Sequence, residues 1–97
     1  MKKSVNPEAL EITRRFFQAL NLAIELGKID SIKVFCAAHN LNRTKYATLK
    51  MTIDKPIDEM TYKCIDVDAL AAICIDFGVS AEWLLLGRGK MLKTDAQ

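Results

Sequence analysis

Apolar residues recur every three or four positions through much of this chain, which is the spacing of one buried face on an α-helix. The first such stretch predicts a helix over residues 7–26, with Phe16, Leu20 and Ile24 on its buried face. Proline is favourable in the first turn of a helix, and Gly27 supplies a C-terminal stop. The pattern therefore predicts a long amphipathic helix near the start of the chain.

Two shorter helices are predicted next, over residues 31–39 and 42–51, with a tight turn between them. The residues that suit their ends are Asp30 or Ser31 as the first cap, Asn40 in the turn and Asn42 as the second cap. Asparagine tolerates the left-handed conformation that ends many helices, and its side-chain oxygen accepts a free backbone N–H at a helix start. Two helices joined in this way form a helix-turn-helix unit.

The helix over residues 42–51 separates its side chains into two faces. Tyr46 and Leu49 are three residues apart, so both are predicted to point toward the core, where the alkyl stem of Lys50 joins them. The residues left facing outward are Arg43, Thr44, Ala47, Thr48 and Met51. Cationic, hydroxyl-bearing and small apolar side chains of this kind read base edges in the major groove of DNA.

The C-terminal half predicts two more helices after an irregular stretch. Residues 52–65 contain Pro56, which interrupts a helix, and they are predicted to form a loop. A fourth helix is predicted over residues 66–77. Its predicted buried stripe consists of Val67, Leu70, Ile73, Cys74 and Phe77.

A short fifth helix is predicted over residues 81–86, between a capping serine at Ser80 and a terminating glycine at Gly87. Trp83 and the three leucines that follow it are too many large apolar side chains for one face of so short a helix. Some of them must therefore be covered either by the first helix or by a partner subunit.

Length and composition fit one small domain. The chain has 97 residues, of which 51% are hydrophobic and 27% are charged, and this composition supports a compact core. We therefore predict a single all-α domain of five helices over residues 1–97, with its core over residues 7–91 and its helix-turn-helix unit over residues 31–51.

The net charge of the chain is only +2, but its charges are unevenly distributed. Residues 28–55 hold six Lys or Arg residues against two aspartates, and this segment contains the helix-turn-helix unit. Residues 58–82 hold one lysine against six acidic residues. Because attraction to phosphate supplies much of the affinity of proteins for DNA, the basic segment favours a DNA-binding surface at the helix-turn-helix unit.

Metal, cofactor and membrane roles find no support in the sequence. The three cysteines form no Cys-x-x-Cys pair and His39 is the only histidine, so we predict no metal site and no cofactor, and we interpret His39 as a turn or packing residue. The N-terminal segment lacks the apolar run of a secretory signal, and the apolar run over residues 69–75 is too short to span a bilayer. These features predict a cytoplasmic protein.

Two stretches of the chain resemble a known family. FCAAHNLNRTKYATLK, over residues 35–50, has apolar, small and turn residues at the spacing of a helix-turn-helix motif. DFGVSAEWLLLGRGKM, over residues 76–91, is similar to the Gly-Val-Ser and Trp-Leu-Leu ending of phage-repressor N-terminal domains. On these residues the chain resembles the small lambda-repressor-like (Xre/Cro-type) helix-turn-helix regulators of bacteria and prophages. It departs from the family pattern at His39 and Asn40, where an apolar residue and a glycine are usual.

The resemblance implies a sequence-specific transcriptional regulator that binds double-stranded DNA, with a recognition helix over residues 42–51. The surplus leucines over residues 84–86 favour a homodimer on two half-sites. The residues expected to face base edges are Arg43, Thr44, Thr48 and Met51. The residues expected to contact the DNA backbone are Lys33, Asn42, Lys45 and Lys50. Arg43 is the first candidate for a bidentate contact to guanine, and the threonine methyl groups are candidates for contact with thymine.

Two other classes of function are open to this sequence. The same fold could serve as a protein-interaction module without DNA reading, such as an antitoxin-like protein or a phage antagonist, with the acidic segment over residues 58–82 as its docking face. An enzyme is the other class, and GRGK over residues 87–90 looks like part of a phosphate-binding loop. Met91 stands where that loop requires a hydroxyl, so no enzymatic activity is predicted.

Overall fold

A computed structural model describes residues 7–52 and 65–92, which form five α-helices. The helices are α1 (Pro7–Glu25), α2 (Ile32–Ala38), α3 (Arg43–Thr52), α4 (Val67–Phe77) and α5 (Ala81–Leu86). The predicted all-α fold class is confirmed, and each helix begins and ends within one residue of its predicted bounds. Most of the predicted loop over residues 52–65 lies outside the described residues. No helix in the described part of the chain has the length and hydropathy to cross a membrane.

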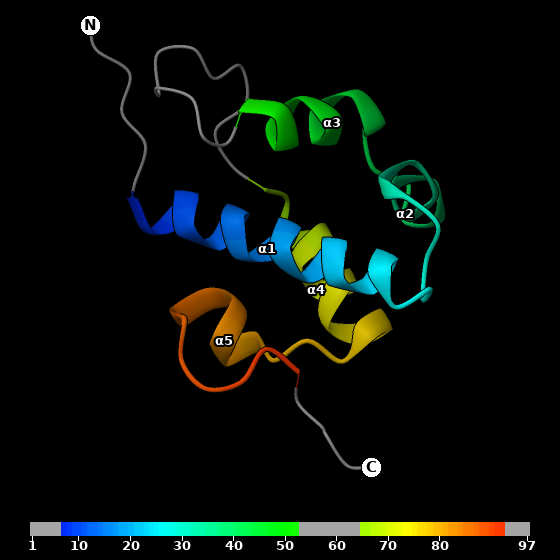
Figure 1. Ribbon diagram of the computed structural model, residues 1–97. Coiled ribbons are helices and arrows are strands. Elements are labelled where there is room, and N and C mark those ends of the chain that lie inside the picture. Colours follow the sequence, from blue (N-terminus) through cyan, green and yellow to red (C-terminus); the bar gives the residue numbers. More distant parts are fainter. Residues whose placement is uncertain (1–6, 53–64, 93–97) are drawn as a thin grey trace, which may run out of the picture.

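The first helix organises the fold. Figure 1 shows α1 crossing the middle of the molecule, with α3 on one side of it and α5 on the other. α4 passes behind α1, and α2 lies beyond the C-terminal end of α1. α1 contacts both α4 and α5, while α2 packs against α3. The helix-turn-helix unit is therefore held at one side of the molecule, and α5 at the other.

The core is centred on aromatic side chains that come from three helices. Phe16 on α1 is fully buried, and its ring makes edge-to-face contacts with Phe17, Phe35 and Tyr46 at centroid distances of 5.1, 5.9 and 5.9 Å. Aromatic pairs prefer this geometry because the positive edge of one ring meets the negative face of the other. The cluster joins α1 to α2 and α3, so it fixes the helix-turn-helix unit on the long helix.

Local side-chain and backbone signals define the ends of the short helices. The Ser31 hydroxyl accepts a hydrogen bond from the backbone N–H of Val34 at 3.2 Å, so Ser31 is the cap of α2. The Ser80 hydroxyl caps α5 in the same way, accepting from the backbone N–H of Trp83 at 3.3 Å. α5 ends at Gly87, whose positive φ of 74° is the left-handed conformation that glycine adopts without strain.

The buried face of α4 differs from the predicted one. Val67 was placed in the predicted stripe, yet its side chain is 78% exposed, so that assignment is wrong. The buried residues of α4 are Ala69, Ala72 and Ile73, whereas Leu70, Cys74 and Phe77 are only partly buried. Alanine side chains are small and let helix backbones approach closely. The face of α4 that carries Ala69 and Ala72 therefore packs against the core. The larger apolar residues at Val67 and Ile75 are left at the surface.

An arginine on α1 holds the C-terminal end of α5. The Arg15 guanidinium donates hydrogen bonds from Nε to the carbonyl oxygen of Leu84 at 2.8 Å and from Nη2 to that of Leu85 at 3.2 Å. These carbonyls lie in the last turn of α5, where the helix itself provides no donors. Of the predicted surplus leucines, Leu84 is buried in the core, whereas Leu85 and Leu86 are 44% and 62% exposed. The first helix therefore covers only part of the apolar surface of α5.

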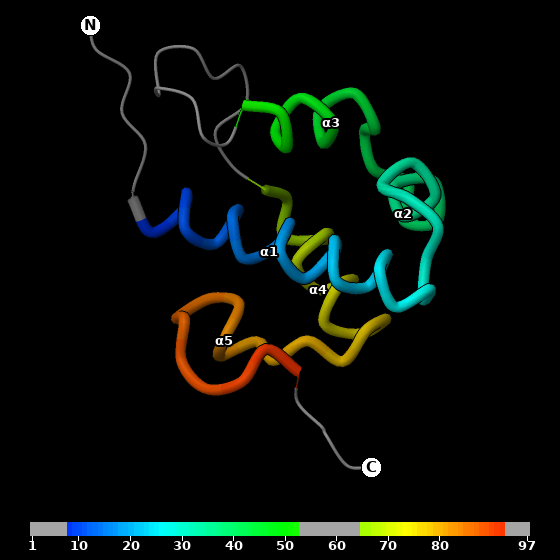
Figure 2. Tube along the Cα trace, viewed as in Figure 1, coloured from blue at the N-terminus to red at the C-terminus, as the bar shows by residue number. Residues whose placement is uncertain are grey.

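After α5 the chain turns back and runs beside the residues that precede α5. Figure 2 shows this return, which brings residues 91–92 next to the connection between α4 and α5. Val79 and Leu92 form an antiparallel β-bridge, and the backbone N–H of Ser80 donates to the carbonyl oxygen of Met91 at 2.7 Å. The returning segment thus closes a loop around α5.

Candidate nucleic-acid interface

The turn between α2 and α3 has the geometry that its sequence predicts. Asn40 adopts a φ of 57°, and in the described residues it is the one non-glycine with a left-handed backbone. The chain then turns back so that the backbone N–H of Leu41 donates to the carbonyl oxygen of Cys36 at 2.8 Å. The Asn42 side chain accepts from the backbone N–H of Lys45 at 3.1 Å, which makes Asn42 the predicted cap of α3. Asn40 therefore forms the turn after α2, and Asn42 caps the start of α3.

Substitution of Asn40 provides a direct check on this turn. Asn40→Val is expected to lower the free energy of unfolding by about 1–2 kcal/mol, because a β-branched side chain clashes with the backbone in the left-handed region. Asn40→Gly is the matched control and is expected to leave stability unchanged or slightly raised, because glycine adopts this conformation freely. Urea denaturation followed by circular dichroism measures both variants. Equal stability of the valine and glycine variants would contradict the assignment.

The third helix presents a distinct outer face. Tyr46 and Leu49 are fully buried, as predicted, and they fix the rotation of α3 about its axis. The exposed residues on the opposite side are Arg43, Thr44, Ala47, Lys50 and Met51. Thr48 is half-buried at the edge of this face. Lys50 was predicted to lay its stem against the core, but its side chain is exposed, because its position on the helix turns it toward Arg43 and away from Leu49.

The charges on the helix-turn-helix unit are all of one sign. α2 and α3 together carry four Lys or Arg residues and no Asp or Glu. Three of these cations, Lys33, Arg43 and Lys50, are exposed. A surface with several exposed cations and no carboxylate of its own is suited to the phosphate backbone of a nucleic acid.

Lys45 is held by a carboxylate of the protein. Its Nζ lies 2.9 Å from Oδ1 of Asp66, the residue just before α4, and its side chain is only 19% exposed. The other oxygen of Asp66 accepts from the Tyr46 hydroxyl at 2.8 Å, and that hydroxyl accepts from the backbone N–H of Asp66 at 3.2 Å. Any contact of Lys45 with a phosphate would therefore have to compete with Asp66. This network ties α3 to the start of α4, and no local sequence pattern predicts it.

The network shifts the proton affinities of its members. The hydrogen bond from Lys45 and then that from Tyr46 hold the pKa of Asp66 below its ordinary value. Burial raises the pKa of the Tyr46 hydroxyl, so Tyr46 keeps its proton and remains a donor. A carboxyl whose pKa is lower in the folded state stabilises the protein only while it is ionised.

Asp66→Asn is therefore expected to reduce stability most at neutral pH. The stabilisation by Asp66 is fully present above about pH 5 and is lost as the pH falls through and below about 4, where the carboxyl takes up a proton in the unfolded chain and then in the native one. The difference in unfolding free energy between wild type and Asp66→Asn should shrink over this range, as measured by urea denaturation at a series of pH values. Asp68→Asn, at an exposed carboxylate on α4, is the matched control. A difference that stays constant down to about pH 2 would exclude this role.

His39 connects the helix-turn-helix unit to α4. Its Nε2 lies 2.6 Å from Oδ2 of Asp76, and its ring packs on that of Phe35 at a centroid distance of 4.9 Å. The interpretation of His39 as a turn and packing residue agrees with this position at the C-terminal end of α2. The partner at Asp76 was not predicted, because it lies 37 residues further along the chain.

The His, Cys, Asp and Glu side chains of the described residues do not gather into a candidate metal site. Residues 7–52 and 65–92 contain no group of three or more His, Cys, Asp or Glu side chains that could hold a metal ion. Cys36 is buried, and burial raises the pKa of its thiol, although the nearby Arg43 acts in the opposite direction. A buried, protonated thiol is a poor nucleophile. Cys64 lies outside the described residues.

Comparison with known proteins identifies no relative: no protein-family description, no curated protein and no solved structure matches this chain. The outer face of α3 and the distribution of charge over the helices are therefore the features from which a function can be inferred.

Proposed function

We propose that this protein is a sequence-specific DNA-binding regulator that lays α3 in the major groove. The observation that carries the proposal is the outer face of α3, where Arg43, Thr44 and Met51 are exposed above the buried Tyr46 and Leu49. A helix anchored on one side and exposed on the other can enter a groove that is wide enough for an α-helix. The absence of acidic residues on α2 and α3 removes the main electrostatic obstacle.

Each outward side chain has a chemical role in this proposal. Arg43 stands at the first position of α3, and the N-terminal residues of a recognition helix contact base edges. Its guanidinium can donate two hydrogen bonds to O6 and N7 of one guanine. Thr44 and Thr48 offer a hydroxyl and a methyl group, and Met51 offers an apolar contact to a thymine methyl. These four residues would read sequence, and the exposed Lys33 and Lys50 would bind phosphates.

The side chains of Lys45 and Asn42 already make contacts within the protein. The Asn42 side chain already caps α3, and Lys45 already pairs with Asp66. Both can still approach a phosphate through their remaining polar atoms, because a carboxamide retains its N–H donors and an ammonium group has three. Their contribution to affinity is expected to be smaller than that of Lys33 or Lys50, which are exposed.

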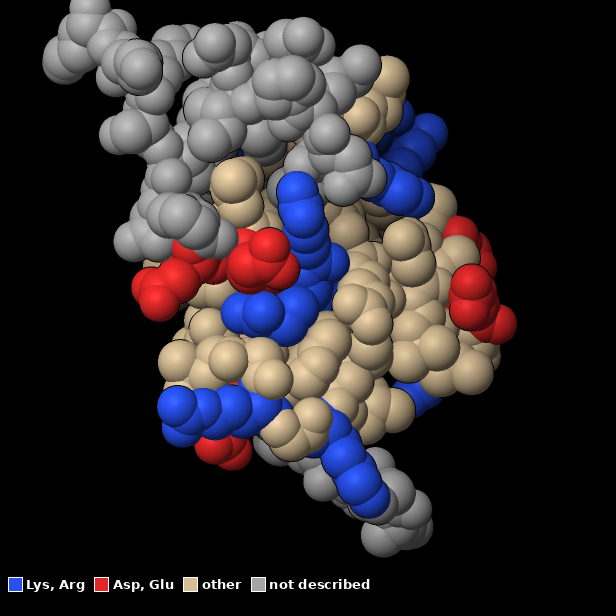
Figure 3. Space-filling view, turned by 60° about the vertical axis from the view of Figure 1, so that its left-hand side comes forward, with Lys and Arg blue, Asp and Glu red and all other residues tan. Residues whose placement is uncertain are grey.

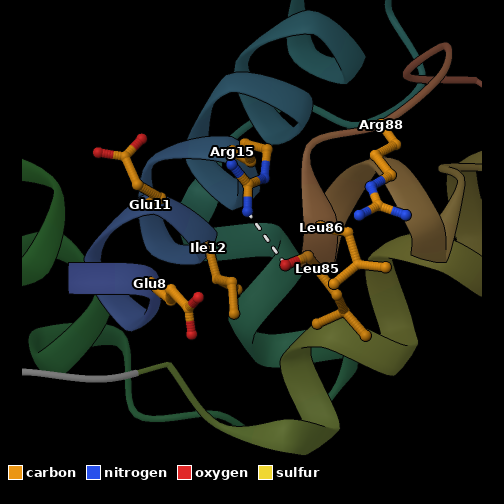
Figure 4. A pocket seen from close by; sticks show the side chains of 7 residues that line it. All are labelled: Glu8, Glu11, Ile12, Arg15, Leu85, Leu86 and Arg88. Carbon is orange, nitrogen blue, oxygen red and sulfur yellow. Dashed lines mark hydrogen bonds between the residues drawn. The ribbon is translucent and has the colours of Figure 1, made fainter. Parts of the chain in front are cut away.

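The protein is proposed to bind DNA as two copies that meet at the side where α1 begins and α5 ends. A hollow of about 640 Å³ lies there, with glutamates on its α1 side, Arg88 on its other side, and Ile12 and Leu86 between them (Figure 4). Figure 3 looks onto this side of the molecule and shows acidic and basic side chains lying next to one another, with uncharged surface around them. A two-fold axis would set Arg88 of one copy against Glu11 of the other, as a self-complementary interface requires. Leu86→Lys is expected to convert dimers to monomers in sedimentation experiments.

The proposal is tested by selecting bound sequences from a random pool of DNA duplexes at two salt concentrations. We expect a defined consensus, arranged as two half-sites related by two-fold symmetry, and an affinity that falls steeply with salt. A set of bound sequences with no consensus would overturn sequence reading, and a consensus without symmetry would overturn the two-copy arrangement.

A DNA-binding regulator of this kind would work in the cytoplasm.

The alternative function is a protein-interaction module that keeps the fold without reading DNA. The modest net charge of +2 favours it, since dedicated DNA-binding domains are commonly more basic. Binding of one protein partner, together with no binding to any duplex at low ionic strength, would select this alternative.

A further inference from the structure

A second apolar surface lies between α4 and α5. It is a groove of about 480 Å³, here named the α4–α5 groove, and every residue that lines it is apolar or small. Val67, Ala71 and Ile75 line it on α4, and Leu85 lines it on α5. This groove is not part of the proposed DNA interface.

The exposure of the α4 wall is unusual for large apolar side chains. Val67 and Ile75 are 78% and 79% exposed, the two highest values among the large apolar residues that the structure describes. With Ala71 they are spaced four residues apart, so they form a continuous stripe along one side of the helix. Leu85, 44% exposed, faces the same groove from α5. A contiguous apolar stripe on the surface of a small domain marks an interaction site.

The charged residues on the two helices that form the groove are all acidic. α4 and α5 carry Asp68, Asp76 and Glu82, and neither helix has a Lys or Arg. Asp76 pairs with His39, whereas Asp68 and Glu82 are exposed. Asp68 is three residues before Ala71, and Glu82 is three residues before Leu85, so each wall of the groove has a carboxylate one helical turn from its apolar stripe.

We propose that the α4–α5 groove binds an amphipathic helix of a partner protein, one whose apolar stripe is flanked by Lys and Arg residues. Apolar residues at helical spacing on the partner would fill the groove, and its cations would face Asp68 and Glu82. A second copy of this chain fits less well, because a symmetric contact through this groove would bring the same acidic edges together. The groove contains no residue of α2 or α3, and its α5 wall lies across α1 from α3 (Figure 1), so the partner and DNA would contact different residues. The protein would thereby join a DNA site to a second protein.

The test uses two designed helical peptides of about 18 residues with the same leucine stripe, one flanked by lysines and the other by glutamates. We expect the lysine peptide to bind at least about tenfold more tightly at low salt in fluorescence anisotropy. In NMR titrations the shifted signals should come from α4 and α5. Ile75→Lys and, independently, Val67→Lys should each weaken the lysine peptide by at least about tenfold. Both side chains are exposed, so both variants should fold, as thermal denaturation would verify.

Leu86→Lys and Arg43→Ala are the matched controls, and both should bind the lysine peptide as the wild type does. Equal binding of the two peptides, signal changes away from α4 and α5, or unchanged binding by both groove variants would each overturn the proposal. A groove variant that turns dimers into monomers, as is expected only of Leu86→Lys, would overturn it in favour of a second copy. None of these outcomes depends on DNA, so the DNA proposal stands or falls separately.

Discussion

Phe16→Ala is expected to lower the free energy of unfolding by about 3–5 kcal/mol, the largest effect of any single substitution considered. Phe16 is fully buried and contacts rings from α1, α2 and α3, so its removal leaves a cavity that touches three helices. Since the whole stability of a domain of this size is about 5–15 kcal/mol, the variant should be close to unfolding at room temperature. Urea denaturation monitored by circular dichroism gives the free energies.

Val34→Ala is the matched control for this loss. Val34 lies on α2 and is 42% exposed, so its shortening should change stability by no more than about 0.5 kcal/mol. If Phe16→Ala cost less than about 1 kcal/mol, the aromatic cluster could not be the centre of the core.

Arg43→Ala is expected to weaken binding to the selected operator by about 1–3 kcal/mol and to relax the preference at one base pair. The physical reason is the loss of two hydrogen bonds from the Arg43 guanidinium to a guanine. Quantitative competition assays against operators changed at single positions measure both effects. The exposed position of Arg43 means that the protein should fold as before, which thermal denaturation checks.

Lys50→Ala is the control for charge alone. It should weaken binding to all sequences alike and lower the slope of affinity against salt by about one phosphate contact, without changing the consensus. Lys45→Ala is a less suitable control, because it also breaks the ion pair between Lys45 and Asp66. The loss of this ion pair would change how α3 packs against the start of α4. An unchanged consensus and affinity for Arg43→Ala would remove Arg43 from the reading face.

The helices could be predicted because their signals are local. Ser31, Asn42 and Ser80 each cap the helix that follows within a few residues, and Gly87 ends a helix through its own backbone conformation. The outer face of α3 was also predictable, since a helix with Tyr46 and Leu49 inside must turn Arg43 outward. Periodicity and capping act over one or two turns, which a sequence displays directly.

The tertiary contacts could not be predicted in the same way. Lys45 meets Asp66 across 21 residues, and His39 meets Asp76 across 37. Nothing in the local pattern distinguishes these carboxylates from exposed ones such as Asp68. The buried side of α4 could not be predicted for another reason, because this helix is apolar on nearly every side. Its periodicity therefore does not show whether the face with Ala69 and Ala72 or the stripe from Val67 to Ile75 is buried.

The hydrogen bonds from Arg15 to the end of α5 join positions that are 69 and 70 residues apart. Leu84 and Val79, which complete the core, also come from the last quarter of the chain. A ribosome makes a protein from its N-terminus, so the α5 partners of α1 exist only after α5 has emerged. This domain can therefore complete its folding only after α5 has left the ribosome, and a nascent chain stalled before α5 would expose the side of its core that α5 covers.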